Sequence, residues 1–173
     1  MIKPPPEPRA DRPAITDPAY GVPNDRVGLL AWTEVNQRME QARVYWVSTV
    51  DRAGRPHATP VDGLWRDNLL YFGGSPQTRR NRNLEGNPAV CVHLESGSEV
   101  VILHGEARLT QADEPLARWL AEATTAKYGY PSRPEEYQAS GVHVFRPSHA
   151  FARKRFPTDA TRYRFGPAAD RDA

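Results

Sequence analysis

Two pairs of β-branched and aromatic runs, each joined by a short glycine-containing loop, constrain the fold of this chain more than any other feature. The first pair is 44–50 and 57–65, with Gly54 in the loop between them. The second pair is 89–95 and 99–109. Such pairs are typical of β-hairpins, whose strands run antiparallel. Further runs with strand character lie at 69–72, 141–145 and 150–165. We therefore predict a mainly β fold with an antiparallel sheet of about six or seven strands.

Three helices are expected beside this sheet. Thr33 is suited to cap a helix that runs to about residue 43, a second helix follows Pro76, and residues 112–128 carry apolar side chains at helical spacing. Residues 1–28 are rich in proline and lack apolar periodicity, so we predict an extended arm without regular helix or strand. We predict a single domain over residues 29–173.

The composition excludes several classes of protein. A net charge of +2 over 173 residues argues against general nucleic-acid binding. The single cysteine, Cys91, excludes an intrachain disulfide, and no histidine pair has metal-ligand spacing. No apolar run reaches the length of a membrane span, and the N-terminus does not resemble a secretory signal. We expect a soluble cytoplasmic protein with no membrane, nucleic-acid or metal partner.

One segment has the composition of an anion site. An apolar strand that ends at Phe72 runs into Gly73 and Gly74, and then into a helix start rich in hydroxyl and guanidinium groups. The first N–H groups of a helix lack partners within the helix, and the helix dipole favours an anion there. The segment therefore predicts a phosphate site, with an ordinary solvated helix face as the alternative.

Several short motifs in sequence order resemble one known family. They are Trp46-Val47-Ser48-Thr49-Val50, Gly54-Arg55-Pro56-His57, Thr59-Pro60-Val61, Leu70-Tyr71-Phe72, Thr78-Arg79-Arg80, Asn83-Leu84, Asn87-Pro88, Gly105-Glu106-Ala107 and Ala160-Thr161-Arg162-Tyr163-Arg164-Phe165. Together they span about residues 29–165 and resemble the pyridoxamine 5'-phosphate oxidase-like superfamily, within it the flavin/deazaflavin oxidoreductase B group.

The resemblance implies a six-stranded antiparallel split β-barrel that works as a homodimer, with a flavin or deazaflavin at the subunit interface. The cofactor ring would lie against residues 56–62, and the phosphate would meet the loop and helix that begin at Gly73. Most relatives carry lysine where this chain has Arg80. The implied cofactor-binding residues are His57, Pro60, Val61, Asp62, Gly74, Ser75, Thr78, Arg79, Arg80 and Asn83.

We expect the deazaflavin F420 as the first candidate cofactor and flavin mononucleotide (FMN) as the alternative. F420 carries an oligoglutamate tail that needs an extended basic groove. Further arginines could extend the phosphate site into such a groove if they fold nearby. They are Arg55, Arg82, Arg153 and Arg155. The expected function is hydride transfer between reduced F420 and a conjugated small molecule.

Trp65, Phe151 and Tyr163 are the expected walls of the substrate pocket. The catalytic residue is left unassigned, because the cofactor carries the chemistry; His57, Tyr163 or water could supply a proton. His93, His104 and His143 are interpreted as structural. The competing functions are an FMN-dependent oxidase or reductase of the pyridoxamine-phosphate-oxidase type, and a non-catalytic protein that binds flavin, F420 or haem.

Overall fold

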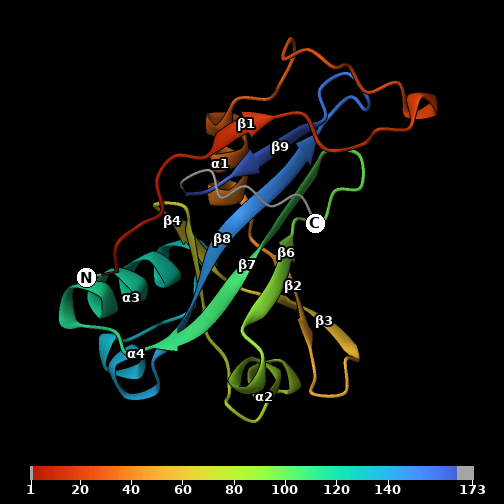
Figure 1. The fold of residues 1–173 in the computed structure, drawn as a ribbon. Helices are drawn as coiled ribbons and strands as arrows, with labels where there is room; N and C mark the ends of the chain where they lie inside the picture. Colours follow the sequence, from red (N-terminus) through yellow and green to blue (C-terminus); the bar gives the residue numbers. More distant parts are fainter. Residues whose placement is uncertain (1, 167–173) are drawn as a thin grey trace.

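One curved antiparallel sheet forms the body of the protein (Figure 1). The computed structural model describes residues 2–166. In that part of the chain the sheet has nine strands. They are β1 (Arg9–Asp11), β2 (Tyr45–Val50), β3 (Pro56–Val61), β4 (Leu64–Arg66), β5 (Leu69–Phe72), β6 (Ala89–His93), β7 (Val100–Thr110), β8 (Val142–Arg153) and β9 (Thr161–Arg164). The helices are α1 (Trp32–Gln41), α2 (Arg79–Gly86), α3 (Glu114–Tyr128) and α4 (Pro134–Ser140), with a single 3-10 turn, η1 (Pro18–Tyr20).

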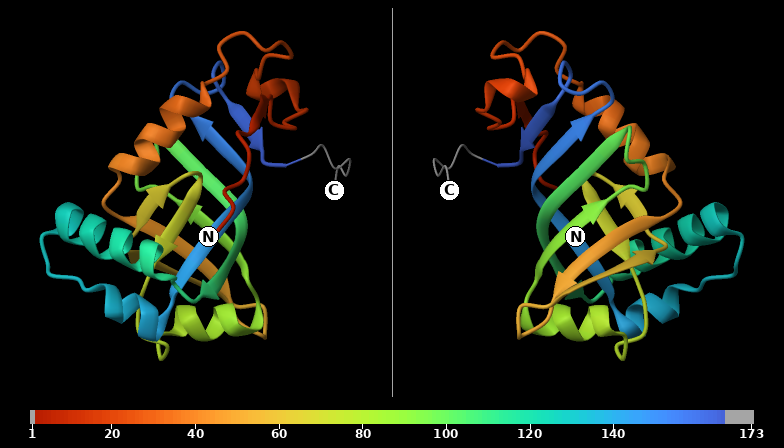
Figure 2. Two further views of the ribbon diagram at one scale, coloured as in Figure 1. Left: turned by 90° about the vertical axis from the view of Figure 1, so that its left-hand side faces the viewer. Right: turned by 90° about the vertical axis from the view of Figure 1, so that its right-hand side faces the viewer.

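The long strand β8 organises the sheet. The main path runs β1-β9-β8-β7-β6-β2-β3, so β7 pairs with one edge of β8 along its length. The other edge of β8 is shared, because β9 pairs with 149–152 and β5 pairs with 143–145. β4 then pairs with β5. The sheet consequently curls around its own inner face, as the two side views in Figure 2 show.

Two hydrophobic clusters fill the structure. The larger lies inside the curl, where alternate residues of β2 such as Tyr45 and Val47 meet Val35 and Met39 of α1. The smaller lies between α3 and strands β4, β5 and β8, and includes Leu120. α3 thereby covers the outside of the β4–β5 hairpin, next to the corner where β5 leads into α2 (Figure 1).

The sheet has more strands than the six or seven predicted from the sequence, because nine are present in the described residues. The run 57–65 is divided into β3 and β4 at Asp62 and Gly63. β8 continues through Pro147. The pairing of β8 with β7 shifts between His104 and Gly105, and this bulge lets the strand accommodate a proline. Pro60 lies on β3, which ends the main path, as expected for an edge strand.

The prediction that the N-terminal arm has no regular structure was wrong. β1 pairs with β9, and Asp17 caps the 3-10 turn, so the arm does contain regular structure. Its pairing partner is far away in sequence, which local composition could not indicate. The end of the predicted domain, 167–173, lies outside the described residues.

The three expected helices are present, and α4 is an additional one. α1 begins at Trp32 rather than after Thr33, and its N-cap residue, Ala31, makes no side-chain capping bond. Among residues 2–166, no helix combines the length and the apolar character that crossing a bilayer requires.

Candidate functional site

The turn between β5 and α2 is held by its own hydrogen bonds. Thr78 is the N-cap of α2, and its Oγ1 accepts a bond from the backbone N–H of Asn81 at 3.3 Å. The same hydroxyl donates to the carbonyl oxygen of Ser75 at 3.0 Å. Asn81 donates its side-chain amide to the carbonyls of Gly74 and Ser75 at 3.0 and 2.9 Å. The turn is therefore ordered before any ligand binds.

Arg80 is the unusual side chain of this turn. Only 6% of the residue is exposed, and its guanidinium donates to the Gly73 carbonyl at 2.6 Å and to Asn81 Oδ1 at 3.1 Å. The group also lies over the ring of Phe72, with 5.3 Å between the guanidinium carbon and the ring centroid. Within residues 2–166, no carboxylate forms an ion pair with it.

Burial lowers the pKa of Arg80, since a cation loses its hydration there. An unpaired buried charge is unfavourable, whereas a guanidinium is well suited to bind phosphate. The corner therefore favours an anion from outside the chain.

Gly74 leaves room for this guanidinium. Its φ is +137°, a conformation that side chains rarely adopt, and a Cβ at this position would overlap Nη2 of Arg80. The backbone conformation thus favours glycine, and a larger residue would displace the end of the Arg80 side chain.

A cavity of about 390 Å³ joins this corner to the end of β3. Its lining includes six of the expected cofactor-binding residues: Pro60, Val61, Asp62, Gly74, Thr78 and Arg80. Two segments that are separate in the sequence are therefore brought to one cavity. This arrangement fits a molecule with a ring near β3 and a phosphate near α2.

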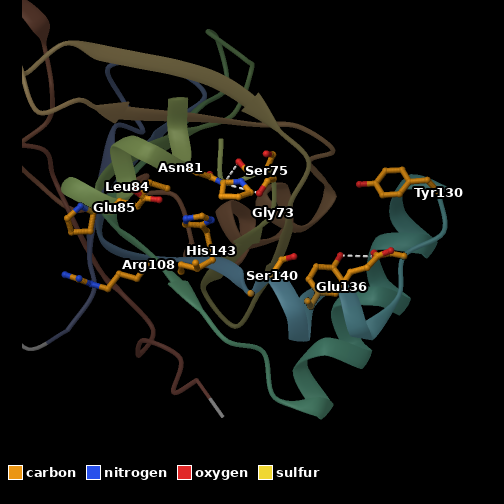
Figure 3. A pocket seen from close by; sticks show the side chains of 17 residues that line it. Gly73, Ser75, Asn81, Leu84, Glu85, Arg108, Tyr130, Glu136, Ser140 and His143 are labelled. Carbon is orange, nitrogen blue, oxygen red and sulfur yellow. Dashed lines mark hydrogen bonds between the residues drawn. The ribbon is translucent and has the colours of Figure 1, made fainter. Parts of the chain in front are cut away.

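A second cavity of about 750 Å³ shares Gly73, Gly74, Tyr130 and Tyr137 with the first. Figure 3 shows Gly73, Asn81 and His143 on one side of it. Residues from α4 and the loop before it lie across the opening (Figure 3). The two cavities adjoin at these four residues, and we refer to them together as the groove; Ser75, also predicted from the sequence, lines the larger cavity.

Tyrosines that sequence reasoning did not identify form much of this groove. Tyr130 donates its hydroxyl to Asp62 Oδ2 at 3.1 Å, and burial together with Asp62 raises the pKa of Tyr130 to about 12. Tyr137 lies within 2.9 Å of Thr124 Oγ1. The Tyr128-Gly129-Tyr130 sequence was a signal of an aromatic turn, but only the folding of α4 against α3 places it at the groove.

Three of the expected cofactor-binding residues face other neighbours. Asn83 is buried and donates its amide to Thr49 Oγ1 at 3.0 Å, which is a structural contact between α2 and β2. Arg79 is half exposed and pairs with Asp51 at 3.5 Å. His57 lies on β3, partly exposed, and belongs to the lining of neither cavity.

The substrate-wall prediction needs correction. Trp65 is 6% exposed and donates its indole N–H to Asn36 Oδ1 at 2.7 Å. Tyr163 is fully buried and donates its hydroxyl to the Leu30 carbonyl at 2.8 Å. Both belong to the larger core in this structure, and neither lines the groove cavities. Phe151 lies on β8 between β7 and β9, outside the lining of the two cavities.

Within residues 2–166, the expected arginines do not form one groove. Arg153 and Arg155 lie at the end of the sheet opposite α2 (Figure 1). Arg153 there lies over the ring of Phe156. Arg55 does lie near Arg79, but both pair with Asp51, which neutralises part of their charge. The basic character of the groove rests instead on Arg80 and, in the larger cavity, on Arg108.

Within residues 2–166, no cluster of three or more histidine, cysteine, aspartate or glutamate side chains is arranged to hold a metal ion. The histidines are dispersed over the sheet. His93 stacks on Trp46, and His104 stacks on His149. His143 alone among these histidines lines the larger groove cavity.

The model of the pyridoxamine 5'-phosphate oxidase family matches residues 31–152. No curated protein matches the chain. Among solved structures, an F420 reductase is 22% identical, with 69% of this chain and 96% of that chain covered and a TM-score of 0.54.

Two further structures have the same fold and other ligands in their names. A FAD-binding protein from Mesorhizobium loti is 17% identical over 78% of this chain and 93% of its own, with a TM-score of 0.55. The haem storage protein HutZ from Vibrio cholerae is 19% identical over 66% and 87%, with a TM-score of 0.50. At these identities the likeness shows the fold alone.

Proposed function

The chain belongs to the pyridoxamine 5'-phosphate oxidase family, and on this premise we propose that it is an oxidoreductase that binds a flavin or deazaflavin by its phosphate. The observation that carries the proposal is Arg80, a buried guanidinium with no carboxylate partner in residues 2–166. A phosphate would supply the missing negative charge and accept charge-assisted hydrogen bonds. Thr78 and Gly74 line the same cavity, where backbone and hydroxyl groups can complete the cradle.

The chain's own residues bind and shield the cofactor. Pro60, Val61 and Asp62 form the wall beside the expected ring, and Tyr130 closes the opposite side through its bond to Asp62. When bound, the cofactor supplies hydride transfer, so the protein needs to position a substrate and exclude water. No side chain is assigned as a catalytic acid or base.

The choice of cofactor depends on two lines of support. The likeness to the flavin/deazaflavin oxidoreductase B group makes F420 the first candidate, with a conjugated small molecule as the hydride acceptor. FMN is the second candidate. Residues 2–166 form no arginine groove that could hold an oligoglutamate tail, and FMN has no such tail because it ends at the phosphate. Glu85 and Glu136 in the larger cavity also support FMN, since they would repel a polyanionic tail.

We also propose that the active form is a homodimer, as the family likeness implies. The fold shared with a haem storage protein keeps a binding-only function as the alternative of another class.

Titration of the purified protein with F420, FMN and haem tests the proposal. We expect F420 or FMN to bind with at least tenfold higher affinity than its counterpart without a phosphate, such as riboflavin for FMN. Equal affinity for FMN and riboflavin would contradict the role of Arg80. Preferential binding of haem, without reduction of any acceptor in a panel of conjugated compounds, would favour the binding-only alternative.

A further inference from the structure

His143 is a buried imidazole that makes no hydrogen bond within the part of the chain that the structure describes. The residue is 6% exposed and lies on β8, opposite Phe72 of β5. Its ring stacks on Phe72 with 5.4 Å between centroids and 9° between planes. It lines the larger cavity beside Gly73 and Asn81 (Figure 3). Its ring nitrogens are not sealed from this cavity, so a molecule that enters the cavity can bind them.

Arg80 lies against the same phenylalanine. Its guanidinium is 5.3 Å from the Phe72 centroid, and its charge acts on His143. Burial first, and Arg80 second, lower the pKa of His143 to about 4. His143 is consequently neutral at pH 7 in the protein without ligand.

An anion at Arg80 changes this balance. Arg80 lines the smaller cavity and His143 the larger, and Gly73, which accepts a bond from Arg80, lines both. The negative charge of an anion at Arg80 offsets the repulsion that Arg80 exerts on an imidazolium at His143. The other titratable and charged side chains around the cavity are Glu85 of α2, Arg108 of β7, Tyr130 of the α3–α4 loop, and Glu136 and Tyr137 of α4. Of the charged side chains in the described residues, Arg80 is the one that shifts the pKa of His143, so an anion bound at Arg80 acts on the same balance.

We propose that His143 and Arg80 form one proton-coupled anion site, in which His143 takes up a proton from solvent when an anion binds at Arg80. The imidazolium becomes the second cation of the loaded site. This inference rests on the proposed phosphate site, and it assigns a binding role to a histidine that the sequence indicated to be structural. The anion is of the phosphate class, and sulfate is a suitable probe because its charge stays constant between pH 4 and pH 9.

The direct test is an NMR titration of His143 with and without saturating sulfate or FMN. We expect the pKa of His143 to rise by two units or more in the bound state, because proton uptake near pH 6 requires a bound pKa close to that pH. Between the free and bound pKa values, anion affinity then increases as pH falls, by up to about tenfold per unit. Calorimetry in buffers of different ionisation enthalpy should show net proton uptake on binding near pH 6.

The variant His143→Gln keeps a hydrogen-bond donor but cannot take up the proton. It should lose the proton uptake and bind FMN more weakly by about twofold or more at pH 6, with a smaller loss at pH 8. His93→Gln is the matched control, because His93 has a partner in the Leu94 carbonyl and lies outside both groove cavities.

Two outcomes would overturn the inference. The first is an unchanged pKa of His143 at saturating ligand. The second is identical proton uptake and affinity in His143→Gln and the wild type. If Arg80→Ala still abolishes phosphate-dependent binding in that case, the proposed function stands without the proton coupling. If Arg80→Ala also has no effect, the phosphate site itself is wrong.

Discussion

Two buried arginines in this protein have opposite surroundings. The side chain of Arg12, in the N-terminal arm, is 10% exposed, and its guanidinium pairs with the Asp25 carboxylate at 3.9 Å. The guanidinium also donates to the backbone carbonyls of Asp25, Val27, Thr158 and Ala160. Arg80 is more deeply buried, yet within residues 2–166 it has no carboxylate, and its partners are one backbone carbonyl, one amide oxygen and a ring face. Arg12 uses its donors to fasten the arm to the β8–β9 loop. Arg80 retains donor capacity at a cavity.

The difference shows how a structural arginine can be distinguished from a binding one. Both residues occur in polar, proline- or glycine-rich segments, and neither has an ion-pairing residue at helical spacing. The two arginines differ only in the hydrogen-bond acceptors that surround each guanidinium. A guanidinium surrounded by carbonyls stabilises the fold, whereas one held over glycine at a cavity stabilises a ligand.

The largest expected effect is on ligand affinity in Arg80→Ala. Loss of a charge-assisted contact worth about 1.5–3 kcal/mol should weaken the binding of FMN or F420 about 10- to 150-fold, as measured by fluorescence titration. The melting temperature should not fall appreciably, because the variant also removes an uncompensated buried charge. Unchanged affinity would remove the distinction between the two arginines.

Gly74→Ala is the control that keeps the charge at this corner. Its added Cβ would displace the Arg80 guanidinium, so affinity should fall although every basic residue remains. Full affinity in Gly74→Ala would indicate that the position of Arg80 is unimportant.

Arg12→Ala should change stability instead of affinity. Removal of the contacts to the arm and the β8–β9 loop should lower the free energy of unfolding by about 1–3 kcal/mol, as measured in urea. Binding of the cofactor by the folded variant should remain within about twofold of the wild type. A large loss of affinity would mean that the arm contributes to the site.

Arg79→Ala should have the smallest effect. Arg79 and Arg80 are adjacent in the sequence, directly after Thr78. Unlike Arg80, Arg79 is half exposed and pairs with Asp51. Exposed ion pairs contribute less than about 1 kcal/mol, so affinity should change by less than about fivefold. A loss as large as that of Arg80→Ala would indicate that both guanidinium groups contact the phosphate.

Much of the fold was predictable, because it depends on local patterns. The alternation in β2, the loop that contains Gly54 and the β-branched residues of β6 and β7 specify antiparallel hairpins wherever they occur. The helix after Pro76 likewise follows from its cap. The strand count was not predictable to the same degree. Whether the arm forms β1 depends on β9, which is about 150 residues away in the chain.

The sequence by itself determined the antiparallel sheet, the family likeness, and the glycine turn that delivers hydroxyls and arginines to a helix start. Those are properties of neighbouring residues. Only the tertiary structure decided that Arg80 rather than Arg79 is buried at the cavity, that Trp65 and Tyr163 belong to the core, and that His143 lies beside the site. The physical reason is that burial and pairing depend on which distant elements meet. Adjacent residues on a helix point in different directions, and only their surroundings separate a binding group from a structural one.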